Sequence, residues 1–276
     1  DIVTAYRQLA QAGAALVVGP LTRNAVTALL EEPLPLPTLA LNAPEYRSEL
    51  PENLYLFGLS VESEARQIAR LAFSAGRQSA LTVTANNVLA KRIQGAFTDE
   101  WLKLGGIITE HLNFAPTQGS HPKLRAAVAK TSADMLFLAA DADKARAVRP
   151  YLDSTLPTYA TSLIYGDRFD AGNNLDLNQI RFVEMPWFLL PDHPAVMAYP
   201  RPASPMNVEL ERFYALGIDA YRLAGLLAAG SLSPNSLPLD GVTGQIGLDG
   251  RQFTRALTAA QFRQGEAVAV AIHEAP

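Results

Sequence analysis

The chain has 276 residues, of which 49% are apolar and 18% charged, and its formal net charge is −4. This ordinary globular composition with a small negative charge gives no electrostatic basis for binding nucleic acid or an anionic membrane surface. The absence of cysteine excludes disulfides, thiolate metal sites and a cysteine nucleophile. The sequence has no run of about 18 apolar residues, so it predicts no transmembrane segment.

The first recognisable pattern lies near the amino terminus. Residues 1–12 have helical spacing of apolar side chains and end at Gly13. The apolar run 15–18 predicts a strand buried on both faces, and Gly19-Pro20 ends it. Thr22 can cap a helix that continues to Leu30. A strand, a sharp turn and a capped helix form half of a βαβ unit.

The same pattern recurs along the chain. Strands are predicted at 15–18, 38–42, 54–60, 80–84, 107–114, 134–140 and 158–162, and helices between most of them, notably after Ser60, at 89–104, near 124–129 and from Asp141 to 152. Because helices separate successive strands, we expect parallel sheets with right-handed crossovers. The pattern restarts after Gly76 and has too many strands for one mononucleotide-binding unit, which predicts two α/β lobes.

The remaining sequence is less regular. We expect a polar loop at 165–178, a strand or crossover at 181–190, an irregular proline-rich connection at 193–205 and a long helix at 209–229. The buried face of this helix is predicted to consist of Phe213, Leu216, Ala220, Tyr221, Ala224 and Leu227. Asp249-Gly250 predicts a hairpin between strands 244–248 and 253–262, and Gln264-Gly265 a second one. Trp187 could pack between lobes or present an apolar surface to a partner.

No catalytic constellation is visible. The sequence contains no glycine-rich phosphate loop, no G-x-S-x-G motif and no histidine pair with metal-ligand spacing. The acidic loop with Asp167, Asp170 and Asp176 lacks the ligand pattern of a calcium loop. We therefore expect no enzyme activity, no metal and no cofactor.

A ligand site is the alternative for four polar side chains. Asn42, Ser60 and Asn86 lie at the carboxyl ends of predicted strands, where ligands of open α/β sheets bind. If two lobes face each other, these side chains would line a cleft opposite the loop that begins at Tyr165. Capping and turn formation account for the same residues, so both readings stay open.

Several segments occur in an order that is specific when they are taken together. They include Ala-Gly-Ala-Ala-Leu-Val-Val-Gly-Pro-Leu (12–21), Phe-Gly-Leu-Ser-Val-Glu-Ser-Glu-Ala-Arg (57–66), Arg-Phe-Tyr-Ala-Leu-Gly-Ile-Asp-Ala-Tyr-Arg-Leu (212–223) and Gly-Val-Thr-Gly-Gln-Ile-Gly-Leu-Asp (241–249). In this order they resemble the carboxyl-terminal domain of the LppC family, the LpoA-type activators of penicillin-binding proteins. The resemblance implies a type I periplasmic-binding-protein fold with two doubly wound parallel-sheet lobes. We place the first lobe at 1–62 plus 190–250 and the second at 63–189 plus 251–276.

The resemblance also implies a function. Family members are periplasmic lipoproteins, attached to the outer membrane by a lipid anchor, and they activate a class A penicillin-binding protein, a peptidoglycan synthase, through contact. The fold also includes receptors for branched-chain amino acids, so a solute-binding protein for a small molecule such as an amino acid is the alternative. Asn42-Ala43-Pro44 and residues 85–88 depart from the loops typical of those receptors.

The start of the chain differs from the family. Family members begin with a strand, a helix and another strand before the helix found here at Asp1. The chain begins with Asp1 rather than Met, as expected of a piece of a longer precursor. We expect a first lobe that lacks its amino-terminal strands, so that the strand containing Leu16 is an open edge or pairs with another chain.

Overall fold

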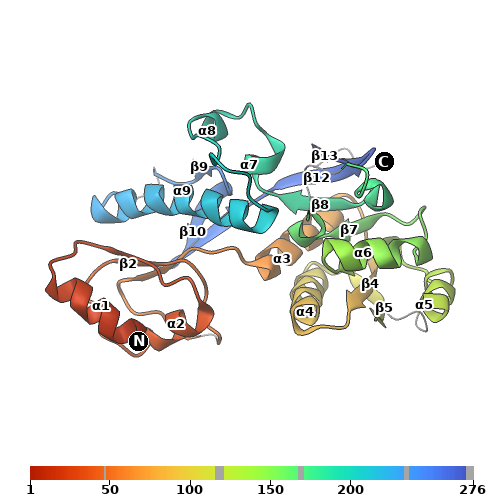
Figure 1. The fold of residues 1–276 in the computed structure, drawn as a ribbon. Helices are drawn as coiled ribbons and strands as arrows, with labels where there is room; N and C mark the ends of the chain where they lie inside the picture. The colour runs from red at the N-terminus through yellow and green to blue at the C-terminus, as the bar shows by residue number, and fades with distance from the viewer. Residues whose placement is uncertain (47, 116–120, 167–170, 233–235, 272–276) are drawn as a thin grey trace. The chain divides into compact units, whose positions relative to one another are not determined.

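The computed structural model describes the chain except residues 47, 116–120, 167–170, 233–235 and 272–276. It contains two compact units. Unit 1 comprises residues 1–60, 191–205 and 210–256, and unit 2 comprises residues 61–190, 206–209 and those from 257 onward. Each unit contains one sheet, which confirms a mixed α/β fold with two mostly parallel sheets (Figure 1). No helix of the described chain has both the length and the apolar character of a membrane span.

The sheet of unit 1 combines a parallel half with an antiparallel half. Its strand order is β1-β2-β3-β11-β10-β9. The strands are β1 (Val17–Val18), β2 (Thr38–Ala40), β3 (Leu54–Leu56), β9 (Leu239–Gly241), β10 (Gly244–Asp249) and β11 (Gln252–Ala256). β1, β2, β3 and β11 run parallel, and β10 is antiparallel to both of its neighbours.

Helices cover both faces of this sheet. They are α1 (Ile2–Gln11), α2 (Arg23–Ala28), α8 (Pro194–Met197) and α9 (Val208–Ala228). One apolar cluster joins α1 and α2 to the sheet through Tyr6, Val26 and Leu54. A second joins α9 to β2 and β10 through Leu216, Leu39 and Ile246. α8 is a short helix within a segment that the proline content had predicted to be irregular.

β1 lies at an edge of the sheet and, among the described strands, pairs only with β2. Val17 and Gly19 donate backbone hydrogen bonds to Pro37 and Leu39 at 3.0 and 2.8 Å. β1 is therefore an edge strand of this chain, as predicted, and its pairing with another chain stays a prediction. The prediction of burial on both faces is wrong, because Val18 is 47% exposed. An edge strand lacks the neighbour that covers a central one.

α9 confirms the predicted long helix but not the face that it buries. Leu216, Ala220 and Leu227 are buried as expected, whereas Phe213 is 46% and Tyr221 80% exposed. The buried face includes the charged residues Arg212 and Asp219. The spacing of apolar residues alone therefore does not predict correctly which face of α9 is buried.

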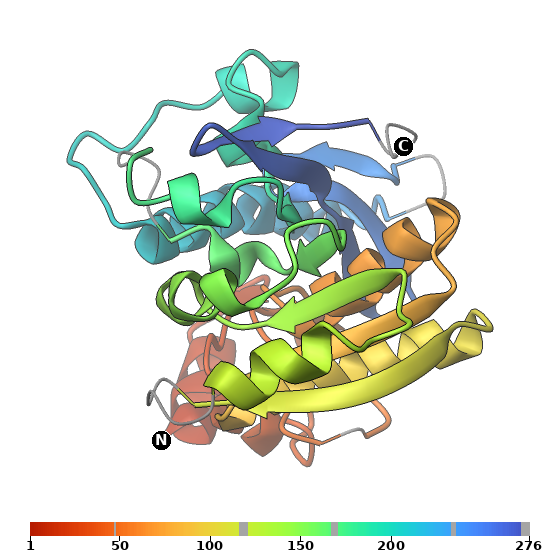
Figure 2. The same cartoon turned by 90° about the vertical axis from the view of Figure 1, so that its right-hand side faces the viewer.

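The sheet of unit 2 has the order β13-β12-β8-β7-β6-β4-β5 (Figure 2). Its strands are β4 (Ser79–Ala85), β5 (Ile107–Phe114), β6 (Met135–Ala139), β7 (Thr158–Ala160), β8 (Arg181–Glu184), β12 (Thr258–Arg263) and β13 (Glu266–Ala269). The helices are α3 (Val61–Ser74), α4 (Val88–Lys103), α5 (His121–Val128), α6 (Ala142–Val148) and α7 (Pro186–Leu189). The five strands from β4 to β8 are parallel, as the alternation with helices predicted.

The predicted strand 253–262 is two strands in different sheets. β11 ends at Ala256 and pairs with β10 and β3, whereas β12 begins at Thr258 and pairs with β8. The predicted boundary of the second lobe at residue 251 is therefore corrected, because residues up to Ala256 belong to unit 1 and unit 2 resumes at Leu257. β11 stays with β10 because the Asp249-Gly250 hairpin turn joins them directly.

Aromatic stacking organises the core of unit 2. The Phe97 ring on α4 lies 4.0 Å from the Phe137 ring on β6 and 5.5 Å from the Trp101 ring, centroid to centroid. All three residues are fully buried. Trp187, the other tryptophan, is also fully buried, so it presents no apolar surface to a partner.

Replacing Phe97 with alanine should destabilise unit 2 by about 3–5 kcal/mol, because it removes a buried ring and leaves a cavity between Phe137 and Trp101. Both tryptophans lie in unit 2, so urea unfolding followed by tryptophan fluorescence reports on this unit. Leu102→Ala on the same helix is the control, since Leu102 is 55% exposed. Equal transition midpoints for the two variants would refute the stacked core.

Candidate functional site

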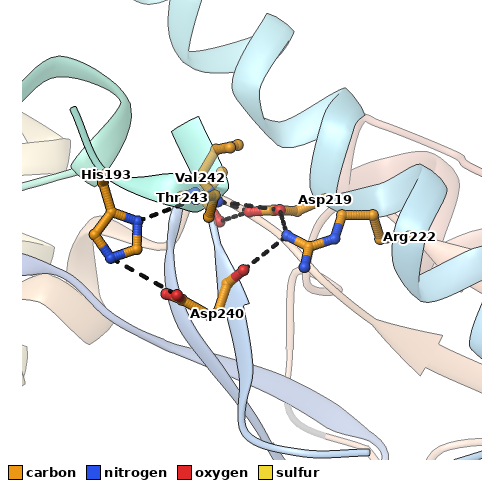
Figure 3. Close-up of polar contacts among 7 residues, drawn as sticks. His193, Asp219, Arg222, Asp240, Val242 and Thr243 are labelled. Atoms are coloured by element: carbon orange, nitrogen blue, oxygen red, sulfur yellow. Dashed lines mark hydrogen bonds and ion pairs between the residues drawn. The ribbon is translucent and has the colours of Figure 1, made fainter. Parts of the chain in front are cut away.

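A fully buried carboxylate on α9 holds the centre of unit 1 together (Figure 3). Asp219 accepts hydrogen bonds from the Thr243 backbone N–H at 2.8 Å, the Thr243 hydroxyl at 2.7 Å and the Val242 N–H at 3.2 Å. A buried charge is costly unless it is hydrogen-bonded. These three donors satisfy it and fasten the turn between β9 and β10 to the helix.

Glycine at position 241 permits this approach. A Cβ atom there would lie 2.6 Å from an Asp219 carboxylate oxygen and 2.7 Å from the Gly244 carbonyl oxygen. Gly244 has a φ of +134°, which side chains of L-residues disfavour. The contact with α9 therefore requires glycine at 241, and the backbone conformation of the turn favours glycine at 244.

The same network extends to the proline-rich segment (Figure 3). The Arg222 guanidinium lies 3.3 Å from the Asp219 carboxylate and donates to the Asp240 carbonyl at 2.8 Å. The Asp240 carboxylate is 3.7 Å from His193 Nε2, and His193 Nδ1 accepts a bond from the Ala195 N–H. The network joins three segments, and its one hydroxyl beside a carboxylate, that of Thr243 on Asp219, is fully buried.

Asn42 and Ser60, the site residues predicted in unit 1, follow the neighbouring strands β2 and β3. The Asn42 amide donates to the Leu21 carbonyl at 2.9 Å and accepts from the Ala43 N–H at 2.9 Å. The end of β3 is close, because a Cβ on Gly58 would lie 3.0 Å from the Asn42 Cα. Ser60 is half-buried directly before α3. Asn42 thus has a structural role, and ligand contact by either residue stays a prediction.

Asn86 and Tyr165, the site residues predicted in unit 2, are farther apart in their sheet. Asn86 follows β4 and is exposed, whereas Tyr165 follows β7, and β6 lies between these two strands. The Tyr165 ring is buried and stacks 6.1 Å from the Phe182 ring. Tyr165 therefore contributes to the core, and a ligand-contact role for these residues stays a prediction.

Glu64 is a buried polar residue that sequence analysis assigned only to the first turn of a helix. It is 3% exposed, and its carboxylate accepts a hydrogen bond from the Ser162 N–H at 3.1 Å. The bond connects α3 to the segment after β7. Nothing in the local pattern indicates this, because residues 64 and 162 are 98 positions apart.

The described residues contain no group of three or more histidine, cysteine, aspartate or glutamate residues that could hold a metal ion. Asp167 and Asp170 of the predicted acidic loop lie outside the described residues. The His111 ring on β5 bonds through Nδ1 to the Thr82 hydroxyl at 2.7 Å and the Gln94 amide at 2.6 Å.

The model of the family described as "LppC putative lipoprotein" matches residues 2–116 and 122–265. The chain belongs to the LppC family. The match includes both segments of the Asp219 network, residues 212–223 and 241–249, and confirms the resemblance drawn from them.

Curated relatives carry the name penicillin-binding protein activator LpoA. The chain is 29% identical to those of Klebsiella pneumoniae and Pectobacterium parmentieri, with 95% of the chain aligned in each case. It covers 42% and 45% of these two proteins. The LppC-family chain therefore spans less than half the length of the curated relatives it matches.

Two solved structures are similar over most of the chain. The LpoA C-domain from Haemophilus influenzae, described as a regulator of PBP1A, is 24% identical with a TM-score of 0.81, over 98% of this chain and 86% of that one. A Chromobacterium violaceum protein, described as "a putative branched-chain amino acid ABC transporter", is 40% identical with a TM-score of 0.78, over 94% and 84% of the two chains. These similarities confirm the type I periplasmic-binding-protein fold.

Replacing Asp219 with alanine should increase amide hydrogen exchange of residues 241–244 about a hundredfold, because buried donors that lose their acceptor cost about 1–3 kcal/mol each. Tyr221→Ala on the same helix is the control, since that side chain is 80% exposed. Thr243→Val should have a smaller effect because it keeps both backbone bonds. If Asp219→Ala left the exchange unchanged, the network would not hold the turn.

Proposed function

We propose that the chain is a domain of an LpoA-type protein that activates a class A penicillin-binding protein by direct contact. The main support is the alignment of 95% of the chain with proteins named penicillin-binding protein activators. The fold of the LpoA C-domain, matched over 98% of the chain, supports the same assignment. The activity belongs to proteins more than twice as long, so its transfer to this domain requires a direct test.

Action by contact, without chemistry of its own, fits the polar groups of the described structure. The buried carboxylate of Asp219 is fully engaged by backbone and hydroxyl donors. His193 and His111 bond to a backbone N–H and to threonine and glutamine side chains, respectively, and not to a serine nucleophile. The two hydroxyls that lie beside a base, Thr82 and Thr243, are fully buried, so neither is exposed to a substrate.

The family also suggests where the protein acts. Its description as a lipoprotein supports a location in the periplasm, attached to the outer membrane through a lipid anchor outside this chain. A soluble domain on such an anchor would reach a peptidoglycan synthase by protein contact.

A solute-binding role is the second candidate. The 40% identity to the Chromobacterium violaceum protein favours it, because that protein is described as "a putative branched-chain amino acid ABC transporter". In this reading the predicted residues Asn42, Ser60, Asn86 and Tyr165 contact a small molecule. The Asn42 amide donates one bond to Leu21 and accepts one from Ala43, which leaves one N–H and one oxygen lone pair for a ligand.

Immobilised chain should retain a purified class A penicillin-binding protein and increase the rate at which that enzyme polymerises glycan strands. A transpeptidase-only penicillin-binding protein is the matched control and should not be retained. The measurements are the retained fraction and the rate of lipid II consumption. Neither retention nor a change in rate would exclude activation by this domain.

Leucine, isoleucine and valine at millimolar concentration should leave the melting temperature unchanged if activation by contact is the function. A ligand at 100 times its dissociation constant would add about 2.7 kcal/mol, which corresponds to a rise of several degrees. Such a rise, abolished in Asn42→Ala but retained in Asn113→Ala, would favour the solute-binding role instead.

A further inference from the structure

The helix α9 is apolar on its exposed side as well as on its buried side. Its buried side packs on the sheet of unit 1 through Leu216 and Leu223 (Figure 1). On the opposite side Leu210 is 55%, Phe213 46% and Tyr221 80% exposed. A helix on the surface of a soluble protein normally turns a polar face to water, and one that is apolar all round is normally covered. α9 therefore presents a face that a partner can cover.

The charged residues of α9 lie outside this exposed face. Glu211, Arg212 and Asp219 are buried. Arg222 is half-buried and bonds to Asp219, and Glu209 is the second residue of the helix. The remaining exposed or half-buried residues of the face are also uncharged, namely Tyr214, Gly217, Ile218, Ala224, Gly225 and Ala228. The face therefore carries no charge that would repel a second copy of itself.

The side chains on this face decrease in size along the helix. Large ones lie toward the N-terminal end and small ones toward the C-terminal end, and only at the centre does a small residue, Gly217, precede a large one, Tyr221. When two copies of α9 lie antiparallel about a two-fold axis at the level of residue 219, large side chains face small ones. The facing pairs are Leu210 and Ala228, Phe213 and Gly225, Tyr214 and Ala224, and Tyr221 and Gly217.

The two exposed glycines leave room for the aromatic rings. A Cβ atom on Gly217 or Gly225 would have no heavy atom within 4 Å, so the space above both residues is open. Residues four positions apart form a row along a helix, and such rows from two helices pack into each other's grooves. Phe213, Gly217, Tyr221 and Gly225 form one row of this kind, in which rings alternate with gaps.

We propose that two copies of this chain form a symmetric dimer through the exposed face of α9, with the two helices antiparallel. A two-fold contact uses the same surface on both copies, which is what a self-complementary pattern fits. The antiparallel arrangement also places the positive N-terminal end of each helix dipole near the negative C-terminal end of the other. A parallel arrangement in register would instead place Phe213 on Phe213 and Gly217 on Gly217.

The exposed area indicates a weak dimer. An aromatic side chain buries about 150–250 Å² when it is fully covered. The exposed fractions of Phe213 and Tyr221 therefore correspond to about 250 Å² in each copy, or about 500 Å² in the dimer. With the smaller side chains around them, this is the low end of specific interfaces, near about 1,200 Å² in total. We expect association in the high micromolar range.

Sedimentation equilibrium of the chain between about 10 µM and about 1 mM tests the proposal. The mean mass should rise with concentration from 29.8 kDa toward twice that value. Tyr221→Lys should weaken self-association at least about tenfold, because it replaces the ring that fills the space over Gly217 of the second copy. Tyr46→Lys is the control, since Tyr46 is a 53% exposed tyrosine outside α9, and it should have no effect.

Gly217→Leu distinguishes this geometry from general hydrophobic association. The change adds apolar surface and replaces a glycine inside a helix, so the variant should fold at least as well as the parent chain. General association would become stronger. In the proposed dimer the leucine occupies the space of the Tyr221 ring of the second copy, so self-association should fall at least about tenfold.

The absence of cysteine permits a test of the orientation of the two helices. A mixture of Gly217→Cys and Tyr221→Cys chains, oxidised mildly, should form the mixed disulfide dimer in excess over either dimer of identical chains. The reason is that positions 217 and 221 face each other across the axis, and a disulfide requires closely spaced Cα atoms.

Four results would overturn the proposal. They are a chain that stays monomeric at about 1 mM, self-association unchanged in Tyr221→Lys, self-association strengthened in Gly217→Leu, or no excess of the mixed disulfide. A monomeric chain that loses its retention of a penicillin-binding protein in Tyr221→Lys would assign the face to that enzyme instead. Self-association is measured without the synthase, so this inference does not depend on the proposed function.

Discussion

The architecture of unit 1 depends on a carboxylate buried in the helix that closes it. Burying the Asp219 carboxylate would cost free energy if it had no hydrogen-bond donors. The β9–β10 turn supplies three donors from two adjacent residues. The helix and the hairpin can therefore pack in one register only. Leu216 and Ile246 supply hydrophobic contact between the same elements, but apolar packing alone does not select one register so strictly. We infer that Asp219 gives specificity and the apolar cluster gives most of the stability.

This constraint joins two of the segments that resemble the family, although they lie apart in the sequence. Asp219 belongs to the segment 212–223, while Gly241 and Thr243 belong to the segment 241–249. Gly241 must lack a side chain because the carboxylate occupies that space, and Thr243 must supply a hydroxyl. The motifs are the two halves of one contact. Their role is architectural, so they identify the family and the fold without indicating which molecule the protein binds.

Sequence patterns predicted the strands, the helices and the division into two α/β units because burial on sheets and helices imposes short periods on apolar residues. They failed where burial depends on distant neighbours. Val18 is exposed because β1 is an edge, and Tyr221 is exposed because charged residues occupy the inward face of α9. The residues near the predicted site show the same limit. Asn42 and Glu64 bond to Leu21 and Ser162, which no local pattern connects to them.

The bonds of these polar residues also bear on the choice between the two functions. A receptor for a polar solute needs side chains whose hydrogen-bonding groups are free to meet the ligand. At Asn42 the oxygen and the nitrogen of the amide both bond to the backbone, and at Tyr165 the ring is packed among phenylalanines. The two bonds hold the Asn42 amide in one orientation and leave one N–H and one oxygen lone pair for a solute. They therefore restrict how a solute could approach Asn42, whereas a protein partner needs only the rigid surface that these bonds maintain.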